Sequence, residues 1–403
     1  MTSISRHPVR HVALVGGAVL ALALTGTSPV FGQGAATAGP VKVGVILQES
    51  GAIVTPEVGA AAEAMIAYFN AELGGAGGQP MEAVLCATDD TVESAVACAD
   101  EFAGAEDVHL VIESTTNPAA IADVLAAAGK PLLVGGVDMT NMLKSGVFAM
   151  EPGAAGIAQA IFAYAASDMG VTHLTVFLAA DPAIETFKPV LDLIAAEAGL
   201  TIDAYVSVPF GEADLTDVVS AGIAPESDGL AMILAPPQCA PAGAALEALA
   251  IDLPVVTAEL CLIDEVVSTG SVDGWHSGTQ SVAPVVDGGA DADEIARILT
   301  SYGEGAESGG LAGLGIGYTW VAHDVLERAG AGDATDASVM GVLASYSSSD
   351  VLGFHEVACP GPGSFVSACN VSTLIVRVSE SAIHDAGGFV ESDFSIFEVL
   401  LGP

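Results

Sequence analysis

The sequence predicts an α/β protein of two lobes, each a mostly parallel sheet covered by helices on both faces. Apolar segments of strand length alternate with segments of helical periodicity along most of the chain, and parallel strands need such crossovers between them. The chain has 403 residues, of which 52% are hydrophobic. At this length a chain has enough apolar residues for a packed core, and two lobes are more common than one.

The first forty residues have the layout of a secretory signal. Two arginines precede an apolar run, Val12 to Leu24, and small residues follow it. The run is too short to be a permanent membrane helix. We therefore expect residues 1–38 to be a signal peptide and short linker, with cleavage near Gln33 or Gly39. The mature protein would be exported to an extracellular, cell-wall or periplasmic location, and the lack of a cysteine at the end of the signal argues against a lipid anchor.

The first lobe is predicted from four strands that alternate with three helices. The expected strands are 41–48, 81–90, 108–114 and 131–136. Thr55 followed by Pro56 is a typical start for the first helix. Asp90 has Glu93 three residues later, in capping-box spacing, and would open the second helix. The third helix would run from Pro118 to Gly129.

The same alternation restarts after residue 156 and predicts the second lobe. The expected elements are a helix at 155–168, a strand at 173–179, a helix at 183–199, a strand at 201–208, a helix at 214–221, a strand at 229–235, a helix at 242–250 and a strand at 253–258. The remaining chain is less regular. We expect a helix at 318–330 and a hairpin that pairs 351–359 with 372–380.

The charge of the chain excludes one class of partner. Asp and Glu number 50, against 9 Lys and Arg. Binding of nucleic acid needs cations to neutralise phosphates, and this chain lacks them. So many carboxylates favour a solvated acidic surface that keeps the protein soluble.

Six cysteines in an exported chain indicate disulfides and not a metal site. Their spacings contain no C-x-x-C pair and fit no zinc pattern. Six cysteines allow fifteen pairings. Pairing of nearest neighbours would give Cys86–Cys98, Cys239–Cys261 and Cys359–Cys369.

Several segments resemble the type I periplasmic-binding-protein family, and in particular the branched-chain amino acid (Leu/Ile/Val)-binding branch that serves ABC transporters. "VKVGVILQESGAIV" resembles the opening strand and first ligand loop of the family. "VLCATDDTVESAVACADEF" resembles its second strand and helix with their cysteine pair, and "LVIESTTNPAAIADVLAAAGKPLLVGG" resembles its hydroxyl-bearing ligand loop. "LPVVTAEL" places Glu259 where the family often has a glutamate.

The resemblance implies three hinge crossovers between the lobes, near Glu151, 280–283 and 354–360. The N-terminal lobe would then comprise 39–155 plus 282–356. The C-terminal lobe would comprise 156–281 plus 357–403. Ligand would bind between the lobes.

The loop from Glu113 to Asn117 is the strongest candidate for ligand contact. In an open parallel sheet, ligands sit outside the carboxyl ends of the strands, and this loop follows such a strand. The hydroxyls of Ser114, Thr115 and Thr116, with free amides at the start of the next helix, would favour an anionic group such as a carboxylate. Thr116 or Asn117 is equally suited to cap that helix.

The other candidates also follow predicted strands. They are Ser50, Val137, Asp138, Thr140, Gln238 and Glu259. Glu259 would receive a ligand ammonium group, although a glutamate after a strand is often a solvated loop charge. Gln238 would donate to the ligand or belong to a Pro-rich turn held by Cys239. Asp138 departs from the family pattern, because its charge would repel a carboxylate.

Few aromatic residues follow the predicted strands. An apolar enclosure for the ligand would have to come from Ile53, Phe187 and either Tyr318 or Trp320. The last two residues are also suited to the core side of their helix.

The sequence contains none of the common catalytic or nucleotide-binding motifs. Its histidines are scattered singly. We therefore expect no enzyme activity, no cofactor and no metal. The expected function is that of a monomeric solute-binding protein, which traps an amino acid or amino-acid-like molecule for an ABC permease in the membrane. The alternatives are an extracellular sensor or scavenger of the same fold without a transporter, and a hydrolase of uncharacterised type.

Overall fold

Two main sheets carry most of the strands in the computed structural model, which describes residues 39–51, 54–89, 91–135 and 139–401. All strands of the first sheet are parallel, in the order β2-β1-β3-β4-β5. Their bounds are β1 Val41–Gln48, β2 Met81–Thr88, β3 Val108–Ser114, β4 Leu132–Val134 and β5 Val147–Phe148.

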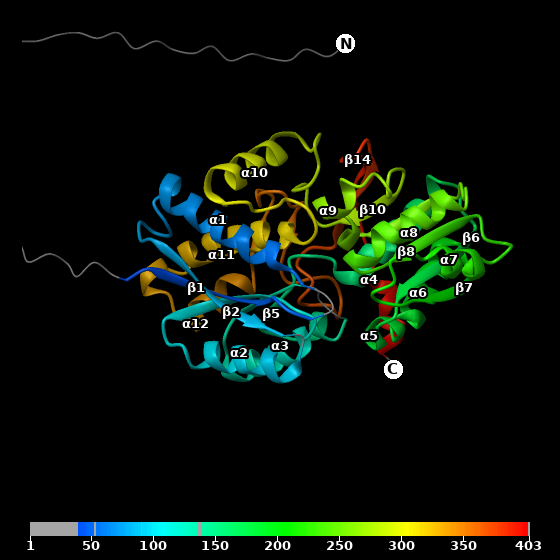
Figure 1. Ribbon diagram of the computed structural model, residues 1–403. Coiled ribbons are helices and arrows are strands. Elements are labelled where there is room, and N and C mark those ends of the chain that lie inside the picture. The colour runs from blue at the N-terminus through cyan, green and yellow to red at the C-terminus, as the bar shows by residue number, and fades with distance from the viewer. Residues whose placement is uncertain (1–38, 52–53, 90, 136–138, 402–403) are drawn as a thin grey trace, which may run out of the picture. The chain divides into compact units, whose positions relative to one another are not determined.

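Helices cover both faces of the first sheet (Figure 1). One face carries α1 (Pro56–Tyr68), α10 (Gly289–Tyr302), α11 (Ala312–Arg328) and α12 (Asp336–Leu343), and the other carries α2 (Val92–Gly104) and α3 (Pro118–Ala128). Strand side chains alternate between these faces. Val43 and Val45 pack with α1 and α11, whereas Ile46 packs with α2 and α3. Burial on both faces explains the nearly continuous apolar run of β1.

The second sheet is mixed, in the order β14-β13-β10-β9-β8-β6-β7. Its strands are β6 His173–Ala179, β7 Thr201–Val208, β8 Gly229–Ile233, β9 Val255–Ala258, β10 His276–Thr279, β13 Ser372–Ser379 and β14 Ala382–Glu391. The strands from β7 to β10 are parallel, and β13 and β14 are antiparallel additions. A separate short pair joins β11 (Ser347–Ser348) to β12 (Val357–Ala358).

Helices also cover both faces of the second sheet. One face carries α4 (Gly153–Ser167), α6 (Lys188–Ala198) and the 3-10 segment η5 (Phe394–Leu401), and the other carries α7 (Thr216–Gly222), α8 (Pro236–Ala248) and α9 (Asp264–Val267). Val176 of β6 faces the first group and Phe177 faces the second. The short elements are α5 (Pro182–Glu185), the π-helical turn η1 (Phe69–Leu73), and the 3-10 turns η2 (Asn141–Leu143), η3 (Glu259–Cys261) and η4 (Ala331–Asp333).

The chain passes between the two sheets three times. It leaves β5 for α4, returns from β10 to α10, and runs from β12 to β13. The helices α11 and α12 pack on the first sheet, α10 packs on α1, and β13 and β14 complete the second sheet. The predicted two-lobed α/β fold with three crossovers is confirmed. The residue limits of the lobes stay a prediction.

Several predicted helix limits are wrong. The N-cap of α2 is Thr91, whose hydroxyl accepts the Ser94 amide at 3.2 Å; Asp90 lies outside the described residues. The helix predicted at 183–199 is two helices, because Pro189 occupies the first turn of α6. The helix predicted at 242–250 already begins at Pro236, which is likewise suited to a first turn.

The predicted hairpin between 351–359 and 372–380 is also wrong. Strand β13 pairs with β14 through the two-residue turn Glu380–Ser381, in which both residues have positive φ. This conformation matches the right-handed twist of a hairpin. The sequence did not predict this turn, because neither of its residues is Gly, Asn or Asp, which are typical of such turns.

All six cysteines pair as nearest neighbours, which confirms the predicted connectivity. The disulfides are Cys86–Cys98, Cys239–Cys261 and Cys359–Cys369. The first ties β2 to α2, and the second ties α8 to η3. Among the described residues, no helix has the length and apolar character needed to cross a membrane.

Candidate functional site

The carboxyl ends of β1 and β3 lie side by side and are tied together by hydrogen bonds. The side-chain oxygen Oε1 of Gln48, at the end of β1, accepts the amide and the hydroxyl of Thr116 at 3.0 and 2.8 Å. Thr55, before α1, donates its hydroxyl to the carbonyl of Ser114 at 3.3 Å. The loop after β3 is therefore held against the start of α1, where the parallel sheet opens.

The amide nest at this strand end is occupied by the protein's own carboxylate. Oε2 of Glu113 accepts both the amide and the hydroxyl of Thr115, each at 3.1 Å. The hydroxyl of Thr115 in turn accepts the amide of Asn117 at 3.1 Å. The amides of residues 115, 116 and 117 are thus all engaged within the chain.

Glu113 is fully buried, and its other oxygen, Oε1, has no hydrogen-bond partner among the described residues. Burial raises the pKa of this carboxyl well above its ordinary value, and the neighbouring charge of Glu151 raises it further. The hydrogen bonds from Thr115 lower the pKa and so act in the opposite direction. A fully buried strand rarely has a glutamate as its penultimate residue, as β3 does.

A second buried carboxylate lies at the end of β9, in the other sheet. Glu259 is 5% exposed, and its Oε2 accepts the amide of Gln280 at 3.4 Å. Burial, and then the charge of Glu151, raise its pKa well above the ordinary value. The side chain of Gln280 is 1% exposed, and neither of its amide atoms has a partner among the described residues.

Tyr318 joins these groups at the first crossover. Its hydroxyl donates to the carbonyl of Val134 at 2.7 Å and accepts the amide of Met150 at 3.1 Å. The charges of Glu151, Glu113 and Glu259 all act on this phenol. Three buried carboxylates from both sheets and the crossover therefore surround one region of the hinge.

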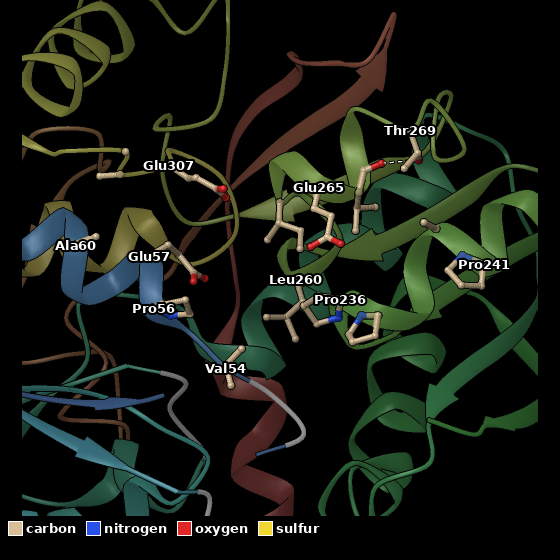
Figure 2. A pocket seen from close by; sticks show the side chains of 16 residues that line it. Val54, Pro56, Glu57, Ala60, Pro236, Pro241, Leu260, Glu265, Thr269 and Glu307 are labelled. Carbon is tan, nitrogen blue, oxygen red and sulfur yellow. Dashed lines mark hydrogen bonds between the residues drawn. The ribbon is translucent and has the colours of Figure 1, made fainter. Parts of the chain in front are cut away.

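A cavity of about 630 Å³ opens beside this region, between elements of the two sheets. Figure 2 shows Glu57, Pro56 and Glu307 on one side of it, and Glu265, Leu260 and Pro236 on the other. Glu57 is in the first turn of α1, and its Oε1 accepts the amide of Leu311 at 3.1 Å. Glu265 belongs to α9, and Glu307 lies in the loop before α11. Most other lining residues are apolar.

The predicted site residues are not all in one place. Ser114 and Thr115 are buried at the end of β3, and Thr116 is exposed beside them. Ser50 and Thr140 are both exposed. Val137 and Asp138 lie outside the described residues, as does Ile53 of the predicted enclosure. Ligand contact by any of these residues stays a prediction.

The side chain of Gln238 is buried, and its hydrogen bonds are to backbone groups and not toward a ligand site. Its Oε1 accepts the amide of Ala235, and its Nε2 donates to the carbonyls of Val208 and Pro209. Asn117 is the N-cap residue of α3 but makes no side-chain capping hydrogen bond. The indole of Trp320 donates to the carbonyl of Asp350.

Apart from Glu259, sequence reasoning missed the acidic residues of the hinge and of the cavity as site residues. These are Glu57, Glu113, Glu151, Glu265 and Glu307, together with the amides of Gln48 and Gln280. In a chain with 50 acidic residues, the presence of a single glutamate does not predict whether it belongs to a site. Only the position of Glu113 at the end of an apolar strand would have indicated a buried carboxylate.

The chain belongs to the family described as periplasmic binding protein, whose model matches residues 40–367. No curated protein shows significant sequence similarity to it.

Solved structures share the fold at low sequence identity. Leucine binding protein LivK from Thermotoga maritima is 17% identical, with 87% of this chain and 99% of that chain covered and a TM-score of 0.72. Branched-chain amino acid transporter substrate binding protein LivJ from Streptococcus pneumoniae, in complex with isoleucine, is 15% identical, with 87% and 99% covered and a TM-score of 0.71.

A fatty acid ABC transporter substrate-binding protein from Thermomonospora curvata is equally similar in fold. It is 14% identical, with 89% of this chain and 94% of that chain covered and a TM-score of 0.72. Proteins of one fold therefore carry names that refer to chemically different solutes. The fold does not identify the ligand of this chain.

Proposed function

We propose that this protein is an exported solute-binding protein, which traps a small polar molecule between its two lobes and delivers it to an ABC permease. The observation that carries this proposal is the cavity of about 630 Å³ between elements of the two sheets, beside the carboxyl ends of parallel strands. Its volume lies within the range of small-molecule sites. Membership of the periplasmic binding protein family supports the same function.

The three crossovers supply the mechanism of trapping. Rotation about a few residues near Glu151 and Gln280 changes the distance between Glu57 and Leu260, which line opposite sides of the cavity. A ligand that contacts both sides stabilises the closed arrangement relative to the open one. A permease then distinguishes the loaded protein from the empty one by its shape.

Two measurements test the proposal. Native mass spectrometry of freshly purified protein should detect a bound small molecule in addition to the polypeptide. Small-angle scattering should then give a larger radius of gyration after the protein has been unfolded, dialysed and refolded to remove that molecule. A protein that retains nothing and keeps one radius throughout would contradict the trapping mechanism.

A matched pair of variants locates the binding site. Ala60, on α1, lines the cavity, and Ala60→Trp should fill part of it and abolish retention of the molecule. Ala97 is exposed on α2, and Ala97→Trp adds the same side chain outside the cavity. Equal retention by both variants, with unchanged circular dichroism, would place the ligand elsewhere.

A further inference from the structure

Two buried carboxyls lie at the hinge, one at the end of a strand in each sheet. Glu113 is the penultimate residue of β3 and is 0% exposed, whereas Glu259 follows β9 and is 5% exposed. Glu151, in the first crossover, is also buried, and its charge acts on both carboxyls. The two sheets and the crossover that joins them thus bring three acidic groups within electrostatic range of one another.

No basic side chain of the described chain forms an ion pair with Glu113 or Glu259. Their hydrogen-bond donors are neutral groups, which include the amide and hydroxyl of Thr115 for Glu113 and the amide of Gln280 for Glu259. Arg377 is exposed on β13, and the other described lysines and arginines form ion pairs elsewhere. The described histidines pair with aspartates or lie against aromatic rings. Protonation is therefore the available way to remove the charge of the two carboxyls.

The geometry at Glu113 favours the protonated acid. Its Oε2 accepts two hydrogen bonds, but its Oε1 is buried and has no partner among the described residues. A carboxylate oxygen that loses its water and gains no donor is destabilised, whereas a protonated carboxyl carries no charge. Burial and the charge of Glu151 accordingly raise the pKa of this group.

Glu259 interacts across the two lobes. The charge of Glu57, at the start of α1, acts on Glu259, and the charge of Glu259 acts on the phenol of Tyr318 on α11. Both helices pack on the first sheet, and Figure 2 shows Glu57 across the cavity from Leu260, the residue after Glu259. Rotation about the crossovers changes these distances, so the energy of the rotation depends on whether Glu259 is ionised.

The titratable groups that face the two carboxyls within the described chain are themselves acidic. They are Glu57 of α1, Glu151 of the first crossover and Tyr318 of α11. Ionisation of Glu113 or Glu259 is therefore opposed by the neighbouring negative charges. Groups that interact in this way release their protons in steps that belong to the cluster and not to one residue.

Gln280, in the second crossover, suits a carboxyl that changes its protonation state. Its side chain is 1% exposed, and neither of its amide atoms has a partner among the described residues. Its backbone amide donates to Oε2 of Glu259 at 3.4 Å, so the two residues are in contact. An amide side chain can donate to a carboxylate or accept from a carboxylic acid, so one residue can serve both forms.

We propose that the hinge is a proton switch, in which protonation of Glu113 and Glu259 holds the two lobes in the arrangement of this structure and ionisation drives them apart. Separation admits water to the carboxylates and increases the distance of Glu259 from Glu57 and Tyr318. The proposal goes beyond the proposed solute-binding function, because it applies to the lobes of the protein without solute as well.

The direction of the pH dependence follows from the linkage between proton binding and opening. Burial and the neighbouring glutamates raise the pKa of both carboxyls in the arrangement of this structure, and an opened, hydrated hinge removes part of that increase. The arrangement of this structure therefore binds more protons, and the open form gains population as pH rises from the ordinary carboxyl range toward the raised pKa. For each proton released on opening, the ratio of the two forms changes by up to about tenfold per pH unit.

Small-angle scattering across pH tests the proposal on protein from which retained solute has been removed by unfolding, dialysis and refolding. The hinge variant is E113Q/E259Q. The control variant is E93Q/E197Q, which changes two exposed glutamates on α2 and α6. Both variants raise the net charge by two. The measurement is made in about 1 M salt, where a screening length of about 3 Å suppresses repulsion between surface charges but acts much less on buried ones.

We expect the radius of gyration of the wild type and of the control variant to increase with pH through one transition, without a change in circular dichroism. The hinge variant should keep one radius, because neither introduced amide titrates. If the double variant folds poorly, the single variants E113Q and E259Q should each show a shallower transition, since one proton fewer is released.

Other outcomes overturn the proposal. A wild-type radius that is constant with pH, or that decreases as pH rises, would reject the switch. An equal increase in all three proteins would assign the expansion to the acidic surface and would reject it too. These measurements contain no solute, so their failure leaves the proposed solute-binding function intact, and native mass spectrometry tests that function separately.

Discussion

Replacement of the buried carboxyl of Glu113 by an amide should change how stability depends on pH. Burial and Glu151 raise the pKa of Glu113 in the folded state. The folded protein therefore holds a proton that the unfolded chain has already lost, and stability falls as pH rises from the ordinary carboxyl range toward the raised pKa. The side chain introduced by Glu113→Gln does not titrate, so this part of the pH dependence should disappear.

The size of the effect follows from the proton count. One proton held only in the folded state lowers the free energy of unfolding by about 1.4 kcal/mol per pH unit. For each pH unit over which the folded site keeps its proton and the unfolded chain has lost it, the wild type should lose about 1.4 kcal/mol more than Glu113→Gln. The amide oxygen introduced at position 113 can still accept the two hydrogen bonds from Thr115, so the mutation mainly removes the titrating group.

Urea unfolding of both proteins at half-unit intervals of pH measures this difference. Glu93→Gln is the control, because Glu93 is exposed on α2, and its curve should run parallel to that of the wild type. If the curves of Glu113→Gln and wild type are also parallel from pH 5 to pH 7, Glu113 titrates in the ordinary carboxyl range, and the argument from its burial is wrong.

Three further predictions concern stability and covalent structure. Tyr318→Phe should lower the free energy of unfolding by about 1–3 kcal/mol, because the carbonyl of Val134 and the amide of Met150 lose their shared partner; an unchanged urea midpoint would contradict this. Replacement of Glu380–Ser381 by Asn-Gly should stabilise the β13–β14 hairpin by about 1 kcal/mol, since both positions have positive φ, and a lower midpoint would show that this turn does not limit stability. Thiol titration of unfolded protein should find no free cysteine before reduction and six after it, and a peptide map that joins Cys98 to Cys239 would refute the pairing.

The sequence by itself determined the fold class and most of its elements. Periodicity is a local property, and the apolar runs of β1 and β3 have the predicted bounds because both faces of these strands are buried. The disulfide pairing was also predictable, because short separations favour neighbours. The local pattern did not decide which of two segments pairs with β13. The sequence predicted 351–359 as the partner strand, but the partner in the structure is β14.

The character of the site was decided only by the tertiary structure. The hydroxyl loop after β3 indicated a carboxylate-binding nest, but whether its donors are free depends on the rotamer of Glu113, which folds back onto Thr115. Glu57 and Glu259 are far apart in sequence, and their charges interact only because the crossovers bring the two sheets together. Electrostatic repulsion between carboxylates depends on distance and burial, and neither quantity is encoded in a local pattern of residues.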